Sequence, residues 1–223
     1  YMEKFEKEDK KVLMEYIKIG TDDCIFAIAR LLRMGESVSD IREQTRIDSF
    51  FLDKMKKIID MENELEQGVG NWELLYQAKK MGFSDQAIGL LWNMTEKDIY
   101  EMRKKYDIFP VYKMIDTCAS EFESYVPYFY STYEEENESI VEDRKKILVL
   151  GSGPIRIGQG VEFDYSTVHA VKTIKEAGYE AIIINNNPET VSTDYTTSDK
   201  LYFEPLCVED VMNVIEIEKP DGI

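Results

Sequence analysis

A glycine-rich loop between a predicted strand and a predicted helix holds the residues most suited to chemistry. Residues 150–165 read LGSGPIRIGQGVEFDY, after a buried strand in KKILV and before a helix in DYSTVHAVKTIKEAG. Four glycines fall within ten residues, at positions 151, 153, 158 and 160, and Arg156 is the one basic residue among them. Glycine permits positive φ and close approach of the backbone to another surface. The loop is therefore suited to lining a narrow passage or docking tightly on a neighbouring domain.

Neither of the common phosphate-binding motifs is complete in this loop. The dinucleotide motif GxGxxG begins with Gly151 and Gly153 but has Arg156 where the third glycine allows close packing of strand and helix. A GxxxxGK[ST] loop could use Gly153 and Gly158, but Gln159 follows where a lysine must reach the phosphates. An NAD- or nucleotide-binding Rossmann-like protein with a helical interaction domain remains the alternative interpretation.

The charge of the chain limits its partners. The 223 residues include 27 basic and 44 acidic side chains, a formal charge of −17, and residues 1–143 alone carry −12. Such a surface repels phosphate backbones, so no nucleic acid is expected as a partner. Two helix pairs, at residues 37–67 and 84–106, resemble helix-turn-helix units, but the acidity favours plain helical packing.

Cysteine and hydropathy patterns indicate a cytoplasmic protein. Cys24, Cys118 and Cys207 lie far apart and His169 is the single histidine, so neither a zinc site nor a disulfide framework is expected. No apolar run approaches the roughly 20 residues that span a bilayer. The start, YMEKFEKEDKK, lacks the apolar segment of a signal peptide. We expect no membrane partner and no metal ligands in this chain.

Residues 8–106 have the periodicity of amphipathic helices. Residues 21–35 predict one helix that begins at Thr21 as N-cap and ends at Gly35. Ser84 and Thr95 are the expected N-caps of two later helices. The side chains expected to face inward in the first two amphipathic segments are Ile25, Ile28, Ala29, Leu32, Phe51, Leu52, Met55, Ile58 and Ile59.

The pattern changes twice after residue 107. Residues 108–139 have two prolines, five tyrosines and no sustained period, which predicts an extended segment laid on a neighbouring surface. The charged stretches EEENES and VEDRK then suggest a solvated junction. We therefore predict a helical domain at 1–143, whose residues from about 108 to 143 form an extended linker, and a second domain at 144–223.

Residues 144–223 alternate between predicted strands and helices. KILVLG, EAIIINNN and KLYFEPL are the strands, and residues 168–177 and 208–220 are the helices. Continuous apolar strands predict a parallel sheet covered on both faces, with ligands at its carboxyl edge. The fold class is thus multidomain, α plus α/β. Because PDGI stands where another strand should begin, we expect a partial sheet and a fragment of a longer protein.

Several longer motifs resemble one enzyme family. GSGPIRIGQGVEFDYSTVHA, NNNPETVSTDYTTSDKLYFEP and EKPDGI are similar to the start of the carboxy-terminal synthetase half of the carbamoyl-phosphate synthase large subunit. VYKMIDTCASEFE, YFYSTYEEE and the helices before them resemble that subunit's oligomerisation domain and its exit segment. The resemblance covers essentially the whole chain. It implies a helical oligomerisation domain followed by part of a pre-ATP-grasp domain.

The resemblance also implies an activity for the whole enzyme. The family is an ATP-dependent carbon–nitrogen ligase that makes carbamoyl phosphate from bicarbonate, glutamine-derived ammonia and two ATP, for arginine or pyrimidine biosynthesis. Its implied partners are a glutamine amidotransferase small subunit, the other large-subunit domains and further copies of the chain. ATP with Mg²⁺ or Mn²⁺, and K⁺, are implied cofactors of the whole enzyme. Their ligands are expected beyond Ile223, so no catalytic residue is assigned, and the chain alone is predicted to be inactive.

The resemblance assigns the glycine loop to an internal passage that carries carbamate to the second active site. Carbamate is small, anionic and short-lived in water, which calls for a narrow bore, fixed donors and little water. Gly160 would leave the bore open, and Arg156 would offset the charge of the anion. The matching residues are Ile155, Arg156, Gly158, Gln159 and Gly160 in the loop, with Glu162 and Glu189 as acidic positions nearby.

Turn residues complete the candidate site. Gly151 and Gly153 shape the first loop, and Asn187 and Thr190 are expected to help build the wall of the same cavity. Each assignment has a purely structural counterpart. Gly160 would only shape a turn, Arg156 would pair with an acidic neighbour (Glu162 or Asp164), Glu189 would cap the turn after Pro188, and local side-chain turns would explain Asn187 and Thr190.

Overall fold

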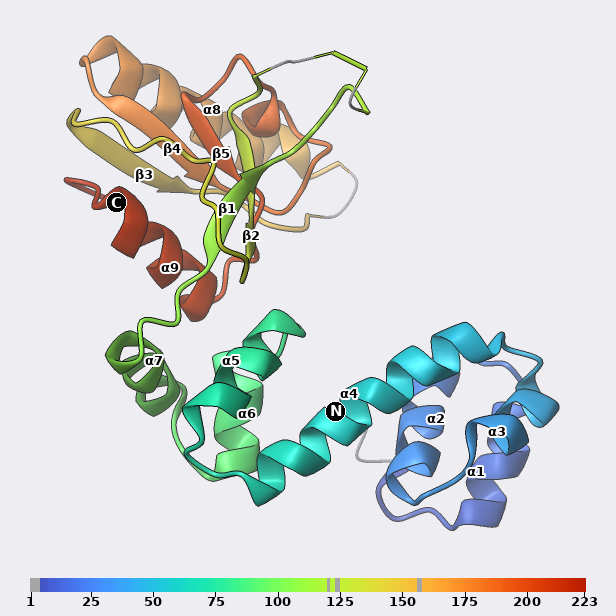
Figure 1. Cartoon of the computed structure of the whole chain (residues 1–223). Coiled ribbons are helices and arrows are strands. Elements are labelled where there is room, and N and C mark those ends of the chain that lie inside the picture. The colour runs from blue at the N-terminus through green and yellow to red at the C-terminus, as the bar shows by residue number, and fades with distance from the viewer. Residues whose placement is uncertain (1–4, 120, 123–124, 156–157) are drawn as a thin grey trace. The chain divides into compact units, whose positions relative to one another are not determined.

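The chain forms two compact units, residues 1–99 and 100–223 (Figure 1). The computed structural model describes residues 5–119, 121–122, 125–155 and 158–223. Helices dominate the first unit and a sheet with flanking helices forms the second. The fold class is therefore the predicted one, a helical region followed by a mostly parallel α/β region.

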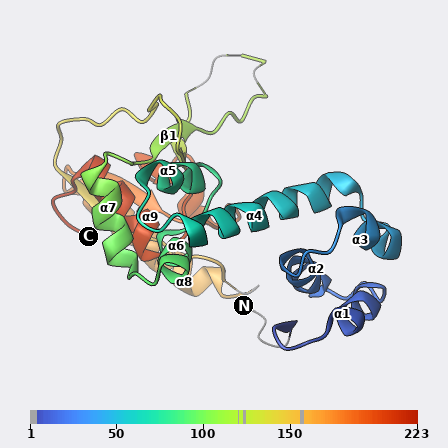
Figure 2. The ribbon, with the colours of Figure 1, turned by 60° about the horizontal axis from the view of Figure 1, so that its bottom comes forward.

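The helical unit is built from short helices around one long helix. Figure 2 shows the long helix α4 extending from α1–α3 to α5 and α6. The predicted caps at Ser84 and Thr95 are confirmed, because Ser84 Oγ accepts the Ala87 N–H at 3.1 Å and Thr95 Oγ1 accepts the Asp98 N–H at 3.2 Å. The elements are α1 (Lys10–Ile17), α2 (Cys24–Arg33), α3 (Val38–Thr45), α4 (Ser49–Gln67), α5 (Trp72–Lys80), α6 (Asp85–Trp92) and α7 (Glu96–Lys105).

The predicted inward faces are partly wrong. Ile25, Phe51 and Ile58 are 53%, 61% and 45% exposed, whereas Cys24 and Leu31 are buried. In α2 the cause is the near-continuous apolar sequence CIFAIARLLR, on which two adjacent helical stripes fit equally well. Helix α2 also begins three residues after the expected cap at Thr21. The core around α1–α4 is formed by Leu13, Ile17, Ala27, Ile28, Leu31, Ile41, Leu52 and Ile59.

A five-stranded sheet in the order β1-β2-β5-β4-β3 forms the second unit. β1 and β2 are antiparallel, and all other pairs are parallel. The backbone of Gly222 extends the sheet, because its carbonyl accepts the Leu148 N–H at 3.0 Å beside β3. The strands are β1 (Val111–Met114), β2 (Tyr128–Thr132), β3 (Lys146–Leu150), β4 (Glu180–Ile184) and β5 (Lys200–Tyr202).

One helix covers each face of this sheet, as predicted. Helix α8 (Gly160–Glu176) packs Val171 and Ile174 on Ala181 and Ile183. Helix α9 (Val208–Glu218) places Val214 in the cluster on the opposite face. Alternate residues of β4 serve the two clusters, because successive side chains of a strand point to opposite faces. The short 3-10 helix η2 (Val191–Thr193) lies between β4 and β5 in the chain.

The segment expected to be a linker belongs to the sheet by its packing. Strands β1 and β2 both come from residues 108–143, and β2 pairs with β5 in the register Tyr128 to Leu201. The charged junction is partly ordered on β1, where the Asn137 and Glu138 side chains accept the N–H groups of Tyr112 and Met114. The second compact unit begins at Tyr100 and so includes both of these strands.

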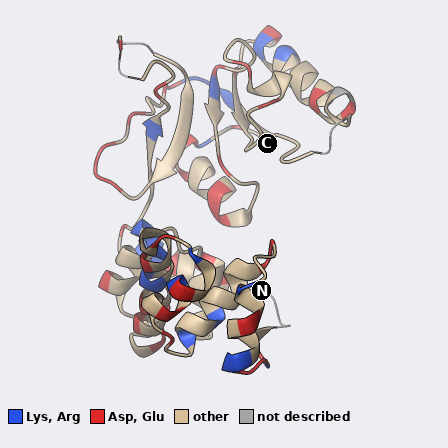
Figure 3. Cartoon of the chain, turned by 90° about the vertical axis from the view of Figure 1, so that its right-hand side faces the viewer, with Lys and Arg blue, Asp and Glu red and all other residues tan. Residues whose placement is uncertain are grey.

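The acidic residues lie on both units. Figure 3 shows red acidic positions on the helices and on the loops around the sheet. Across the described ranges, no helix is both long enough and apolar enough to span a membrane.

Candidate functional site

Two loops leave neighbouring parallel strands at the carboxyl edge of the sheet. The first loop follows β3 and the second follows β4, and the last residues of these strands, Leu150 and Ile184, are in register. The first loop leads into α8 and the second into η2. Both loops that the sequence singled out therefore start side by side at the edge where parallel sheets present ligands.

The start of the glycine loop is packed tightly. The Gly151 N–H donates to the Ile184 carbonyl at 2.8 Å, which closes the loop onto the neighbouring strand. A Cβ at Gly151 would lie 2.6 Å from Cγ of Asn185, so only glycine leaves room. Gly153 has a φ of +65° and donates its N–H to Oδ1 of Asn185 at 3.1 Å. Close approach and positive φ thus account for these two glycines.

The remainder of the loop leads into the helix. Gly158 has a φ of +93° and open space around its Cα, and the Gln159 carbonyl accepts the first N–H bonds of α8. The side chain of Ile155 approaches Gly160, where an added Cβ would lie 3.7 Å from Cδ1. Arg156, the expected partner for an anion or an acidic neighbour, lies outside the described residues.

The polar side chains of the second loop form hydrogen bonds within the loop. Oδ1 of Asn187 accepts the Glu189 N–H at 3.0 Å, and the Thr190 hydroxyl forms hydrogen bonds with the Ser192 and Thr193 hydroxyls at 3.2 and 3.3 Å. The buried Oδ2 of Asp164, on α8, accepts the Ser192 N–H at 2.8 Å. Asn187 and Thr190 therefore shape this loop, whatever else they contact.

Glu162 and Glu189 are exposed, the first in the opening turn of α8 and the second in the loop after β4. No hydrogen bond or ion pair joins their carboxylates to a side chain in the described part of the chain. Their carboxylates are thus available to solvent or to a facing surface. The loops bring Gly151, Gly153 and Asn187 together around Asn185.

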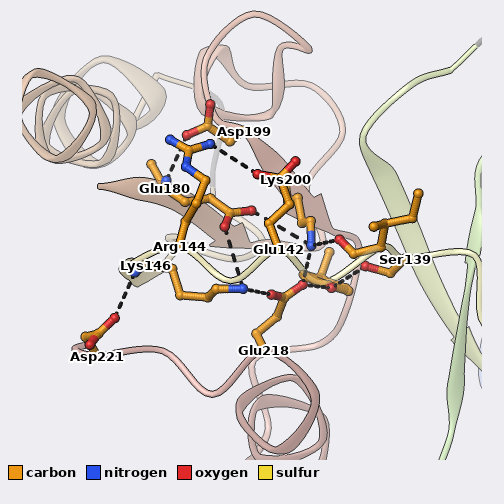
Figure 4. Close-up of polar contacts among 12 residues, drawn as sticks. Ser139, Glu142, Arg144, Lys146, Glu180, Asp199, Lys200, Glu218 and Asp221 are labelled. Atoms are coloured by element: carbon orange, nitrogen blue, oxygen red, sulfur yellow. Dashed lines mark hydrogen bonds and ion pairs between the residues drawn. The ribbon is translucent and has the colours of Figure 1, made fainter. Parts of the chain in front are cut away.

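A buried ionic cluster at the opposite edge was not predicted. Figure 4 shows Lys146, Glu180 and Lys200, the first residues of three parallel strands, around Glu218 of α9. Glu218 accepts hydrogen bonds from Lys146 Nζ at 2.9 Å, Lys200 Nζ at 2.8 Å and the Tyr202 hydroxyl. Burial opposes the charge of Glu218, but these bonds outweigh it and lower the pKa of the carboxyl. The cluster holds α9 to the sheet.

A second unpredicted carboxylate, Glu204, follows β5. It is 4% exposed and accepts the Ser131 N–H of β2. Burial raises its pKa to about 7, although the Ser131 N–H opposes the shift, while Asp210 and Glu209 reinforce it. In a sequence, a glutamate after a strand resembles any solvated loop residue, so no signal marked it.

The carboxyl edge presents glycine backbone, amide side chains and two exposed carboxylates. Such groups can line a passage or a docking surface for a small polar molecule. Among the residues that the structure describes, no group of three His, Cys, Asp or Glu side chains could hold a metal ion. The geometry supports positioning and contact of a bound molecule.

Two family models match successive parts of the chain. The model described as carbamoyl-phosphate synthetase large chain, oligomerisation domain, matches residues 1–107. The model described as carbamoyl phosphate synthase preATP-grasp domain matches residues 143–223. Both describe domains of the same large chain, and together they cover more than four fifths of the sequence. The chain therefore belongs to the carbamoyl-phosphate synthase large-chain family.

Proposed function

We propose that this chain acts within a glutamine-dependent carbamoyl-phosphate synthase, which makes carbamoyl phosphate from bicarbonate, ammonia released from glutamine and two ATP. The observation that carries the proposal is the succession of two large-chain domains, at residues 1–107 and 143–223. ATP, Mg²⁺ or Mn²⁺ and K⁺ would be bound by other domains of the enzyme. The chain alone would not catalyse the reaction.

The helical unit would supply subunit association. Its family description is an oligomerisation domain, and several large apolar side chains on α2 and α4 are exposed. Apolar surface of this kind is often covered by a partner. The partners would be another copy of the chain, the remaining large-subunit domains and the glutamine amidotransferase small subunit.

The two loops at the carboxyl edge would form part of the carbamate passage. Supporting observations are the close packing of Gly151 against Asn185, the small residue Gly160 beside Ile155, and the exposed carboxylates of Glu162 and Glu189. The backbone of such a loop offers hydrogen bonds to a small anion without filling the bore. Gln159 and Gly158 would complete the same wall.

Sedimentation velocity over a range of concentrations tests the association. The chain should self-associate reversibly, and millimolar NAD or ATP should not change the distribution. A monomer that binds NAD tightly would refute the proposal and favour the dinucleotide-binding alternative. Because the formal charge is −17, the experiment is run at moderate salt, where repulsion between copies is screened.

A bulky substitution tests the passage in the assembled enzyme. Gly160→Leu should lower carbamoyl phosphate formed per ATP consumed, because carbamate would leak before its phosphorylation. Lys172→Leu is the matched control, since Lys172 lies on the same helix with a side chain that is 68% exposed. If both variants form the same amount of carbamoyl phosphate per ATP consumed, Gly160 does not line the passage.

A further inference from the structure

Asn185 ties the two loops of the carboxyl edge to each other. It directly follows β4 and is only 1% exposed. Its Oδ1 accepts the Gly153 N–H of the first loop at 3.1 Å and the Asn187 N–H of the second at 3.4 Å. Gly151 packs against the same amide so closely that a Cβ would lie 2.8 Å from Nδ2. One side-chain oxygen therefore sets the spacing between the loops.

Asp164 makes a second tie in the opposite direction. It belongs to α8, which follows the first loop, and it is 4% exposed. Its Oδ2 accepts the Ser192 N–H at 2.8 Å and so holds η2, which follows the second loop. The Tyr128 hydroxyl donates to the Thr193 carbonyl at 2.5 Å and supports the same turn from β2. Each loop is thus fixed by a residue from the other βα unit.

Asn185 and Asp164 each bury a polar atom that packing alone would not require. Nδ2 of Asn185 and Oδ1 of Asp164 are buried without a hydrogen-bond partner in the described part of the chain. A buried polar atom without a partner destabilises a fold, and an apolar side chain of the same shape would avoid that cost. Holding backbone N–H groups in place is a reason to keep these residues.

We propose that Asn185 and Asp164 are positioning residues that lock the two loops together and fix the wall they form. Their importance for carbamate transfer rests on the proposed function, whereas the ties themselves do not. Neither side chain need touch the anion. They act through the backbone of Gly153, Asn187 and Ser192.

Amide exchange measured by NMR tests the ties in this chain. Asn185→Leu and Asn185→Ala remove the acceptor, and the Gly153 and Asn187 amides should then exchange about fivefold faster, as expected for one lost hydrogen bond. Asn185→Asp keeps an acceptor oxygen and should restore slow exchange. Asp164→Leu should have the same effect at Ser192, and Asp164→Asn should reverse it. The exposed neighbour provides the control, Asn186→Leu.

Unchanged exchange at Gly153 and Ser192 would overturn the proposal, provided that the amides of β4 show the variant sheet to be intact. If Asn185→Leu does not fold, Asn185→Ala, which also lacks the acceptor, keeps this outcome readable. In the assembled enzyme, Asp164→Leu should lower carbamoyl phosphate per ATP by about twofold or more, and Asp164→Asn should restore it. If the amides exchange faster but carbamoyl phosphate per ATP is unchanged, the proposed passage is refuted, whereas the hydrogen bonds between the loops are confirmed.

Discussion

Replacing Glu218 by glutamine should destabilise the α/β unit far more than the same change two residues earlier. Glu218 is 1% exposed and accepts bonds from two ammonium groups, Lys146 at 2.9 Å and Lys200 at 2.8 Å. With Glu180, the cluster holds two positive and two negative charges. Glu218→Gln keeps the shape but leaves two buried ammonium groups with one carboxylate. We expect this imbalance to dominate the effect.

The size of this destabilisation depends on the contacts that the two lysines keep in the Glu218→Gln variant. Lys146 and Lys200 would keep Glu180 at 3.6 and 3.8 Å, which is too long for strong hydrogen bonds. Removing one partner of a buried ion pair costs about 3–5 kcal/mol. A loss of that size should lower the midpoint of thermal unfolding of this unit by about 10–20 °C.

The two tryptophans allow the units to be followed separately. Trp72 and Trp92 both lie in the helical unit, so tryptophan fluorescence reports the unfolding of that unit alone. Hydrogen exchange in β3, β4 and β5 reports the α/β unit. Glu218→Gln should speed exchange in these strands and leave the fluorescence transition in urea unchanged.

Glu216→Gln provides the matched control on the same helix. Glu216 accepts bonds from Tyr100 at 2.7 Å and Lys104 at 3.0 Å, in a partly exposed position where solvent screens the pair. Equal effects of the two substitutions would refute the reasoning. The pH dependence is a second check. Because the pKa of Glu218 is lowered from 4.5, its stabilisation is present above pH 4.5 and should disappear as the pH falls further.

Three further substitutions have defined outcomes. The pKa of Glu204 in the folded state, about 7, lies above the ordinary 4.5, so the free energy of unfolding should fall as the pH rises from 4.5 to 7. Glu204→Gln should therefore add about 3 kcal/mol to the free energy of unfolding at pH 8 and nothing at pH 4, measured by urea unfolding. Gly89→Ala should lower the urea midpoint by tryptophan fluorescence, despite a better helix propensity, because its Cβ would lie 2.7 Å from the Met94 carbonyl oxygen. Gly151→Ala should cost about 1–3 kcal/mol by collision with Asn185 at 2.6 Å, measured by exchange in β3 and β4.

Local patterns predicted the α/β unit well because its elements follow each other in the chain. The apolar strands β3 and β4 and the helices α8 and α9 each have a clear period, and parallel pairing follows from their alternation. Strands β1 and β2 did not stand out. They are four and five residues long, and β2 pairs with β5, which lies about seventy residues later. Nothing local selects such a partner.

The helical unit shows a different limit. Its caps at Ser84 and Thr95 were predictable because a cap uses bonds within one turn. The inward face of α2 was not, since burial of Cys24 in place of Ile25 depends on which stripe meets α1 and α4. Where nearly every position is apolar, the hydrophobic periodicity does not indicate which face of the helix is buried.

In the candidate site too, local features were predictable from the sequence and long-range contacts were not. Glycines can be recognised in a sequence, and Gly151 and Gly153 have the close packing and the positive φ that favour glycine. The side chains that hold the two loops, Asn185 and Asp164, accept N–H groups 32 and 28 positions away, at Gly153 and Ser192. An asparagine after a strand and an aspartate early in a helix are ordinary residues in isolation. Their roles arise only because parallel pairing of β3 with β4 places both loops at one edge, so the contacts that fix the site are consequences of the fold.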